Sequence, residues 1–273
     1  MNFNQLLHKI KNWNVVEKYI YTIIGVFILT YGVQSLSVLA GNSKENFFIS
    51  NFGLQAGWSF LKYHFYSFFT YSFIHIRFFH LLFNLMVLYY IGNLFLSFFK
   101  EKDFHIYFFF GAFFGGVFFV LANYFLLDNG NSILIGASAS ITALLVGLAV
   151  KAPNYQIHIR FVGYVKIWIL TLIWLAISFV SIPTANAGGQ IAHLGGAFFG
   201  LVYTLLQESS FSFKQNKSHL KTVYKKSDFG LSKHQKDRLH QQKVDFLLDK
   251  ISKSGYNSLS KAEREFLARA SKR

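Results

Sequence analysis

Four polar side chains interrupt otherwise apolar stretches of the sequence: His80, Asn84, Ser138 and His193. A serine hydroxyl beside an imidazole can act as a nucleophile, because the imidazole accepts its proton. A histidine and an asparagine can donate hydrogen bonds to the oxyanion that such an attack creates. No Asp or Glu is placed to orient His193, so the pair would form a dyad and not a triad. These residue types predict acyl-transfer chemistry, provided that the fold brings them together.

Each of these residues also has a purely structural interpretation. A serine in a membrane helix commonly bonds its own backbone, and a lone histidine there can be a packed hydrogen-bond partner, a proton relay or a metal ligand. His80 and Asn84 are four residues apart and could cross-link helices from one helix face. Small-residue helix packing would explain two glycine pairs, Gly111 with Gly115 and Gly196 with Gly200. A proton channel or transporter is a further alternative, but the inner halves of these segments are almost purely apolar.

The composition indicates the environment of these residues. The chain has 273 residues, of which 53% are hydrophobic and only 14% are charged, whereas soluble domains carry about 25% charged residues. The mean hydropathy is +0.34. The absence of cysteine excludes disulfides, thiolate metal sites and a cysteine nucleophile. The composition therefore predicts an integral membrane protein.

Six segments are apolar enough to cross a hydrocarbon core of about 30 Å, which takes roughly 20 residues. They are Tyr19–Leu39, Phe78–Phe99, Phe104–Leu127, Ser132–Val150, Phe161–Ile182 and Gln190–Leu206. The first lacks a convincing cleavage site, so we do not expect a signal peptide. Lys and Arg gather at both chain ends and at the connections on the same side, which predicts that both termini are cytoplasmic. The long aromatic connection Ala40–Ile76 is expected to lie partly in the membrane interface on the outer side.

This orientation places the four polar side chains at one level. The second, fourth and sixth segments begin at the outer face, and the polar residues follow soon after each start. At 1.5 Å per residue, His80, Asn84 and His193 lie ~3–10 Å below the outer surface, with Ser138 at a similar depth. Polar residues inside a membrane usually face a cavity or a partner. Gly136 permits a tight entry that would leave the Ser138 backbone N–H free.

The order and spacing of these residues resemble the rhomboid family of intramembrane serine proteases. The matching motifs are His75-x4-His80-x3-Asn84, Gly136-Ala137-Ser138 and Ala192-His193-Leu194-Gly195-Gly196-x3-Gly200. The resemblance covers about residues 15–207. It implies an all-α membrane protein with a six-transmembrane-helix bundle.

The resemblance also implies a role for each motif residue. Ser138 would be the nucleophile and His193 the general base. The oxyanion hole would consist of His80, Asn84 and the Ser138 amide. Structural support would come from His75, Gly136, Gly196 and Gly200.

The sequence departs from the family pattern near the serine. Ala139 stands where a glycine often follows the nucleophile, which is a mild change. Thr142 stands where an aromatic residue is often found, so ring support for His193 must come from elsewhere. A Trp-Arg pair in the first connection and an acidic residue near Ser97 are also missing.

The final quarter of the chain has a different composition. Residues 208–273 hold 16 of the 27 Lys and Arg. We expect a cytoplasmic segment at 1–14, a membrane domain at 15–207, a basic linker at 208–235 and a small helical tail at 236–273. Gly255 should separate two short helices, with Ser260 and Glu263 forming a capping box. The tail resembles that of rhomboids from Bacteroidetes-type bacteria.

These patterns predict a bacterial inner-membrane endopeptidase that cleaves membrane-anchored proteins near the outer face of their transmembrane helix. The chemistry needs no metal or cofactor. The alternative is a catalytically inactive relative that binds transmembrane helices. Membrane lipids are expected partners, and the basic tail could rest on anionic lipid. Nothing beyond charge suggests nucleic acid, and the sequence leaves the substrate and the oligomeric state open.

Overall fold

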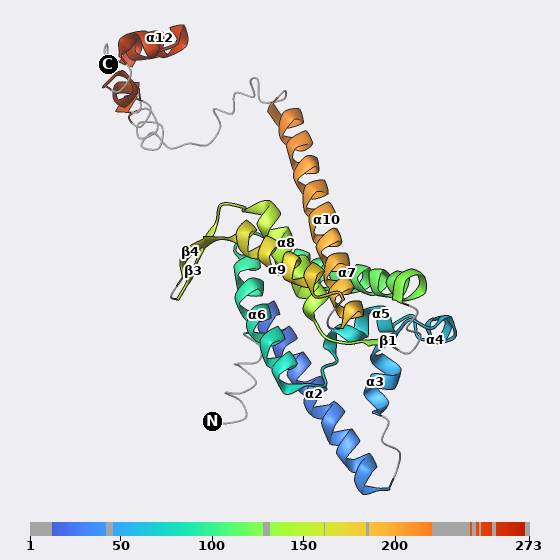
Figure 1. Cartoon of the computed structure of the whole chain (residues 1–273). Coiled ribbons are helices and arrows are strands. Elements are labelled where there is room, and N and C mark those ends of the chain that lie inside the picture. The colour runs from blue at the N-terminus through green and yellow to red at the C-terminus, as the bar shows by residue number, and fades with distance from the viewer. Residues whose placement is uncertain are drawn as a thin grey trace, which may run out of the picture. The chain divides into compact units, whose positions relative to one another are not determined.

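The computed structural model describes residues 13–41, 46–127, 132–160, 162–183, 186–219, 241, 244–245, 247–252 and 255–270. The chain divides into two compact units, Met1–Phe213 and Lys214–Arg273, and each is described by itself. The first unit is built almost entirely of helices (Figure 1). Most of the predicted N-terminal segment 1–14 lies outside the described residues.

Four helices in the described part of the chain are long and apolar enough to cross a membrane. They are α2 (Val15–Leu39), α6 (Phe78–Leu96), α7 (Glu101–Ala122) with its π-helical end η2 (Asn123–Leu127), and α10 (Ala187–His219). Large apolar side chains remain exposed on them, such as Ile28 at 65% and Leu36 at 67% on α2. An apolar surface of this extent suits lipid and not water. The chain is therefore an integral membrane protein.

The other two predicted spans form shorter helices than the sequence predicts. α8 (Ser138–Lys151) and α9 (Ile167–Val180) have 14 residues each, which is about 21 Å. The predicted starts near Ser132 and Phe161 are wrong, because short strands precede both helices. Within the described residues the fold is thus mostly helical with two small antiparallel sheets, in which β1 (Leu54–Gln55) pairs with β2 (Ile133–Leu134) and β3 (Gln156–Ile159) pairs with β4 (Gly163–Lys166).

α8 forms the centre of the first unit. Its residues 139–149 are buried without a break, as expected for a helix that is apolar on every side. A Cβ on Gly196 of α10 would lie 2.1 Å from the Ala139 carbonyl oxygen, and one on Gly111 of α7 would lie 2.6 Å from Ala143 Cβ. Glycine therefore lets α7 and α10 approach α8 closely. Figure 1 shows α8 among α6, α7, α9 and α10.

The connection between α2 and α6 is folded onto the helices. Its elements are α3 (Phe47–Phe52), β1, α4 (Trp58–Tyr63), α5 (Ser67–Thr70) and the 3-10 helix η1 (Tyr71–Phe73). Tyr71 is fully buried, and its Oη donates to the Ala112 carbonyl oxygen at 2.9 Å. Trp58, by contrast, is 83% exposed. The connection is thus anchored on α7 and, through β1 and β2, on the segment that leads into α8. Its place in the membrane interface stays a prediction.

α10 is longer than predicted at both ends. It begins at Ala187 instead of Gln190 and ends at His219 instead of Leu206. Residues 208–219 of the predicted linker are therefore helical, and residues 220–235 lie outside the described residues. Side-chain contacts hold α10 against its neighbours. Lys151 of α8 pairs with Glu208, and Tyr107 Oη of α7 lies 2.6 Å from Thr204 Oγ1.

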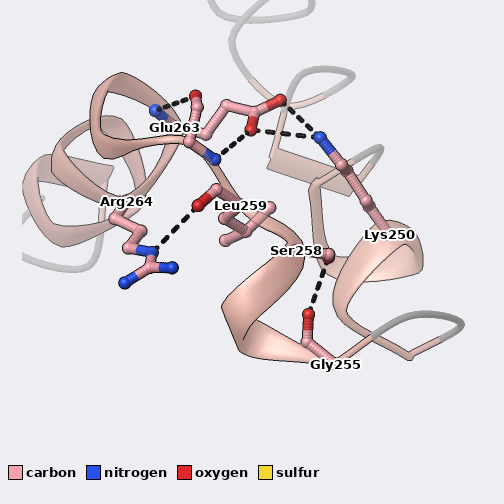
Figure 2. A network of polar contacts seen from close by, with 7 residues as sticks. Lys250, Gly255, Ser258, Leu259, Glu263 and Arg264 are labelled. Atoms are coloured by element: carbon pink, nitrogen blue, oxygen red, sulfur yellow. Dashed lines mark hydrogen bonds and ion pairs between the residues drawn. The ribbon is translucent and has the colours of Figure 1, made fainter.

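In the second unit, residues 247–252 and α12 (Lys261–Ala270) are helical on either side of Gly255, whose φ is +75°. The predicted capping box is confirmed. The Ser260 N–H donates to Glu263 Oε2 at 2.7 Å, and the Glu263 N–H donates to Ser260 Oγ at 3.3 Å. Lys250 Nζ lies 2.9 Å from Glu263 Oε1 (Figure 2). The bonds from Ser260 and Lys250 hold the pKa of Glu263 at about 2.

Candidate active site

A tight turn places Ser138 at the start of α8. Gly136 has a φ of +106°, which L side chains rarely adopt, and a Cβ there would lie 2.6 Å from His80 Cε1. The Gly136 N–H donates to the Tyr71 carbonyl oxygen at 2.9 Å, so the folded first connection holds the turn. Because Ser138 is the first residue of α8, its backbone N–H has no acceptor within the helix.

The structure brings Ser138 and His193 into contact. His193 Nε2 lies 2.8 Å from Ser138 Oγ. The histidine comes from α10, three residues before the glycine that packs on the first turn of α8, so the close helix packing sets this distance. The imidazole is only 9% exposed. A neutral imidazole with its proton on Nδ1 can accept the serine proton at Nε2. This geometry would allow the imidazole to act as a base toward the serine hydroxyl.

Helix α9 contacts the same imidazole from another side. Ser178 Oγ lies 3.0 Å from His193 Nδ1. The ring of Trp174, one turn earlier, lies 5.3 Å from the His193 ring between centroids, with an interplanar angle of 33°. Trp174 Nε1 donates to Thr142 Oγ1 at 2.9 Å. The ring next to His193 therefore comes from α9, and Thr142 anchors it.

The two other predicted donors line the same cavity as Ser138 and His193, which has a volume of about 370 Å³. His80 lies in the first turn of α6 and Asn84 lies one turn later. Asn84 Nδ2 donates one proton to the His80 carbonyl oxygen at 2.8 Å. An amide nitrogen carries two protons, so the second can serve a ligand. Side chains from α6, α8 and α10 thus share one cavity.

This cavity lies in a segment that matches a known family. The Rhomboid domain family model matches residues 62–209, more than half of the chain. The chain belongs to the rhomboid family. A second model, a family of unknown function (DUF6576), matches residues 232–273. No curated protein gives a significant match.

The predicted support residues of this rhomboid domain contact α8 or the turn before it. His75 is fully buried, and its Nε2 accepts the Ala137 N–H at 3.4 Å. Burial lowers the pKa of His75 to about 4, so the ring is neutral at pH 7 and keeps a lone pair for this N–H. A Cβ on Gly200 would lie 2.5 Å from the Ala143 carbonyl oxygen, one turn after the equivalent contact of Gly196.

Several residues of the candidate site do not follow from the sequence patterns. Asn186, with φ +46°, and Gln190 line the cavity from the start of α10. The sequence does show Trp174 and Ser178 as two polar groups four residues apart in an apolar helix. They are not recognised as partners of His193 when only an Asp or Glu is sought for that role. The remaining lining consists of Gly189 and the apolar side chains of Phe83, Val87, Leu134, Ile135 and Ile141. Within the described ranges, no three His, Cys, Asp or Glu side chains form a group that could hold a metal.

Proposed function

We propose that this rhomboid-family protein is an intramembrane serine endopeptidase of a bacterial inner membrane. Ser138 is the nucleophile and His193 is the general base. The observation that carries the proposal is the 2.8 Å contact between Ser138 Oγ and His193 Nε2 at a cavity within the helical unit. The substrates are membrane-anchored proteins, cleaved near the outer face of their transmembrane helix.

We further propose six membrane spans, formed by α2, α6, α7, α8, α9 and α10, with both termini in the cytoplasm. The distribution of Lys and Arg supports this orientation. The short α8 is compatible with it, because residues 139–149 are enclosed by protein and need not match the lipid thickness. Non-helical backbone at membrane depth, such as the turn at Gly136, is tolerated where protein covers it.

The reaction follows from the geometry. Ser138 Oγ attacks the carbonyl carbon of the peptide while His193 Nε2 takes the hydroxyl proton. The carbonyl oxygen becomes an oxyanion, which accepts hydrogen bonds from the Ser138 N–H, His80 and Asn84. The N-terminal end of α8 adds a positive dipole at the same point. His193 then protonates the leaving amine, and an acyl ester remains on Ser138.

Hydrolysis of the ester completes the cycle. A water molecule attacks the ester carbonyl while His193 takes its proton, and Ser138 leaves as the alcohol. The substrate segment must be extended, because a helical peptide bond is shielded by its own turns. The alternative function is an inactive relative that binds transmembrane helices. The presence of both Ser138 and His193 in hydrogen-bond contact favours the enzyme.

A fluorophosphonate probe tests the proposal on purified full-length protein in detergent. We expect the wild type to be labelled, and both Ser138→Ala and His193→Ala to lose labelling. The double variant should be little worse than either single variant, because the two residues act as a unit. Comparing the membrane proteins shed by cells that express wild type or Ser138→Ala tests peptide-bond cleavage.

Ser140→Ala is the matched control. Ser140 is also buried on α8, and its Oγ has no hydrogen-bond partner within the described structure. We expect this variant to be labelled like the wild type. Labelling that survives in Ser138→Ala but is lost in Ser140→Ala contradicts the assignment. A folded wild type that is neither labelled nor able to shed proteins supports the inactive alternative.

A further inference from the structure

Two side chains of α9 contact His193, although neither belongs to the pair that carries the proposed reaction. Ser178 Oγ lies 3.0 Å from His193 Nδ1, and Ser178 is 1% exposed. The Trp174 ring lies 5.3 Å from the His193 ring and is tilted by 33°. Residues four apart occupy one face of a helix. One face of α9 thus contacts both a nitrogen and the ring of the imidazole.

We propose that Ser178 and Trp174 are positioning residues, and that α9 holds the His193 imidazole ready to accept the Ser138 proton. This inference rests on the proposed function, in which His193 Nε2 is the base. It adds two side chains beside the Ser138–His193 pair, which the sequence describes as a dyad.

We infer that Ser178 Oγ acts as the acceptor in this contact, which stabilises the productive tautomer of His193, with its proton on Nδ1. A neutral imidazole carries one N–H, and only its other nitrogen can accept a proton. When Nδ1–H donates to Ser178 Oγ, the Nε2 lone pair faces Ser138 Oγ at 2.8 Å. After Nε2 takes the proton, Nδ1–H still has its acceptor in a buried place, where an unsatisfied N–H is costly. A neutral hydroxyl is a weaker acceptor than a carboxylate, so the effect is smaller than in an acid-containing triad.

Trp174 is itself fixed relative to the nucleophile. Its Nε1–H donates to Thr142 Oγ1 at 2.9 Å, and the Thr142 hydroxyl donates to the Ser138 carbonyl oxygen at 2.8 Å. Thr142 is fully buried. This chain of hydrogen bonds ties the indole beside His193 to the backbone of the residue that His193 activates. Both partners of the proton transfer are therefore held to α9.

Ser178→Ala tests the first contact. We expect the second-order rate constant of fluorophosphonate labelling at Ser138 to fall by about tenfold, the effect of one neutral hydrogen bond. Thr171→Val is the matched control, because Thr171 is also buried on α9 but donates to the Ile167 carbonyl oxygen of its own helix at 2.9 Å. The control should label at the wild-type rate. An unchanged rate in Ser178→Ala overturns the role of Ser178.

A double-mutant cycle tests the second contact. Trp174→Phe and Thr142→Val each remove the hydrogen bond between Trp174 Nε1 and Thr142 Oγ1. We therefore expect each substitution to slow labelling. The double variant should be labelled no more slowly than the slower of the two single variants. Trp168→Phe is the control, because Trp168 also lies on α9 but is 41% exposed and lines no part of the cavity. Losses that simply add in the double variant overturn the anchoring of Trp174 by Thr142.

Nitrogen NMR of protein labelled with ¹⁵N-histidine separates positioning from a loss of fold. The His193 signals are identified by their absence in His193→Gln. We expect Nδ1 to be protonated in the wild type, and the two nitrogen shifts to move toward the other tautomer in Ser178→Ala. This readout needs no turnover. A wild-type protein that the probe does not label would therefore contradict the proposed function without contradicting the positioning role. Nitrogen shifts that are identical in Ser178→Ala and wild type would contradict the positioning role.

Discussion

Asn84 and Asn93 make the same local contact in different surroundings. Each donates from Nδ2 to the carbonyl oxygen four residues earlier on α6, at 2.8 and 2.7 Å. Asn84 lines the cavity. Asn93 Oδ1 instead accepts from Asn14 Nδ2 at 2.9 Å. At the residue scale, the second amide proton of Asn84 is therefore the one that an oxyanion in the cavity can use.

We expect Asn84→Ala to reduce turnover without abolishing it. Loss of one oxyanion donor lowers kcat by about 10²–10³-fold, and His80 and the Ser138 N–H remain. The measurement is cleavage of a purified membrane-anchored substrate in detergent. Asn93→Ala removes the matching helix contact away from the cavity and should leave kcat unchanged. Equal turnover in Asn84→Ala and wild type removes Asn84 from the site.

His75 gives the protein a defined response to acid. Its pKa is about 4 in the folded protein because of burial, compared with an ordinary 6.5. Between these values the unfolded chain binds a proton that the folded chain does not, so stability falls as the pH falls from 6.5 toward 4. At pH 5 the loss is ~2 kcal/mol. His75→Gln keeps an acceptor for the Ala137 N–H but does not titrate.

The melting temperature of His75→Gln in detergent should therefore fall less between pH 7 and pH 5 than that of the wild type. Titrating groups far from residue 75 contribute equally to both proteins, so the difference reports His75 together with its neighbour His80, whose ring centroid lies 5.1 Å away. Equal decreases in the two proteins contradict the explanation.

The depth estimated for each polar residue from its position in a predicted span identifies four residues as neighbours. The structure places all four around one cavity, namely His80, Asn84, Ser138 and His193. The same estimate does not identify Ser178 as part of the site, because a hydroxyl in an apolar helix usually forms a hydrogen bond with its own backbone. Only the crossing of α9 and α10 shows that this hydroxyl meets His193 Nδ1. The aromatic ring that the family often has at the position of Thr142 is likewise supplied by Trp174 of α9. Spacing within one segment of the sequence cannot reveal a contact from a different helix.

At the scale of elements, hydropathy detects apolar segments better than it detects helix ends. α8 begins six residues later than predicted, because Leu134 pairs with Leu54 across 80 residues and Gly136 takes a positive φ. A pairing of such long range leaves no local pattern in the sequence. α10 continues past its apolar part to His219. A hydropathy window reports only apolar residues, so it does not detect the polar end of a helix.

Gly196→Ala tests the packing that brings the two proposed catalytic residues together. Its Cβ would lie 2.1 Å from the Ala139 carbonyl oxygen, and a backbone atom within a buried helix has little room to move. We expect a destabilisation of about 1–3 kcal/mol and slower labelling of Ser138, because α10 carries His193. Thermal unfolding in detergent measures the first effect.

Gly25→Ala is the matched control for this substitution. Gly25 lies on α2, and a Cβ there would have no atom within 4 Å. It should leave the melting temperature unchanged or raise it slightly, since alanine favours helix over glycine. A Gly196→Ala protein as stable as the Gly25→Ala protein contradicts the packing argument.

At the scale of the whole molecule, the two family models fall on different units. The Rhomboid model ends at residue 209, and the model of unknown function begins at residue 232. The division between the compact units lies between these positions, after Phe213. All the residues of the proposed site belong to the first unit, whereas the basic charge is concentrated after residue 207. The contact of the tail with anionic lipid stays a prediction.

We expect removal of residues 214–273 to leave fluorophosphonate labelling in detergent within about twofold of the full chain. On the proposed orientation, a hydrocarbon core of about 30 Å separates the cytoplasmic tail from a site near the outer face. The contacts that hold α10 also remain, because Lys151 pairs with Glu208 and Tyr107 contacts Thr204. A truncated protein that is folded but unlabelled would mean that the tail acts on the site or that the orientation is inverted. Protease added to spheroplasts, whose outer membrane has been opened, separates these outcomes, because a cytoplasmic tail is protected there and an external tail is cut.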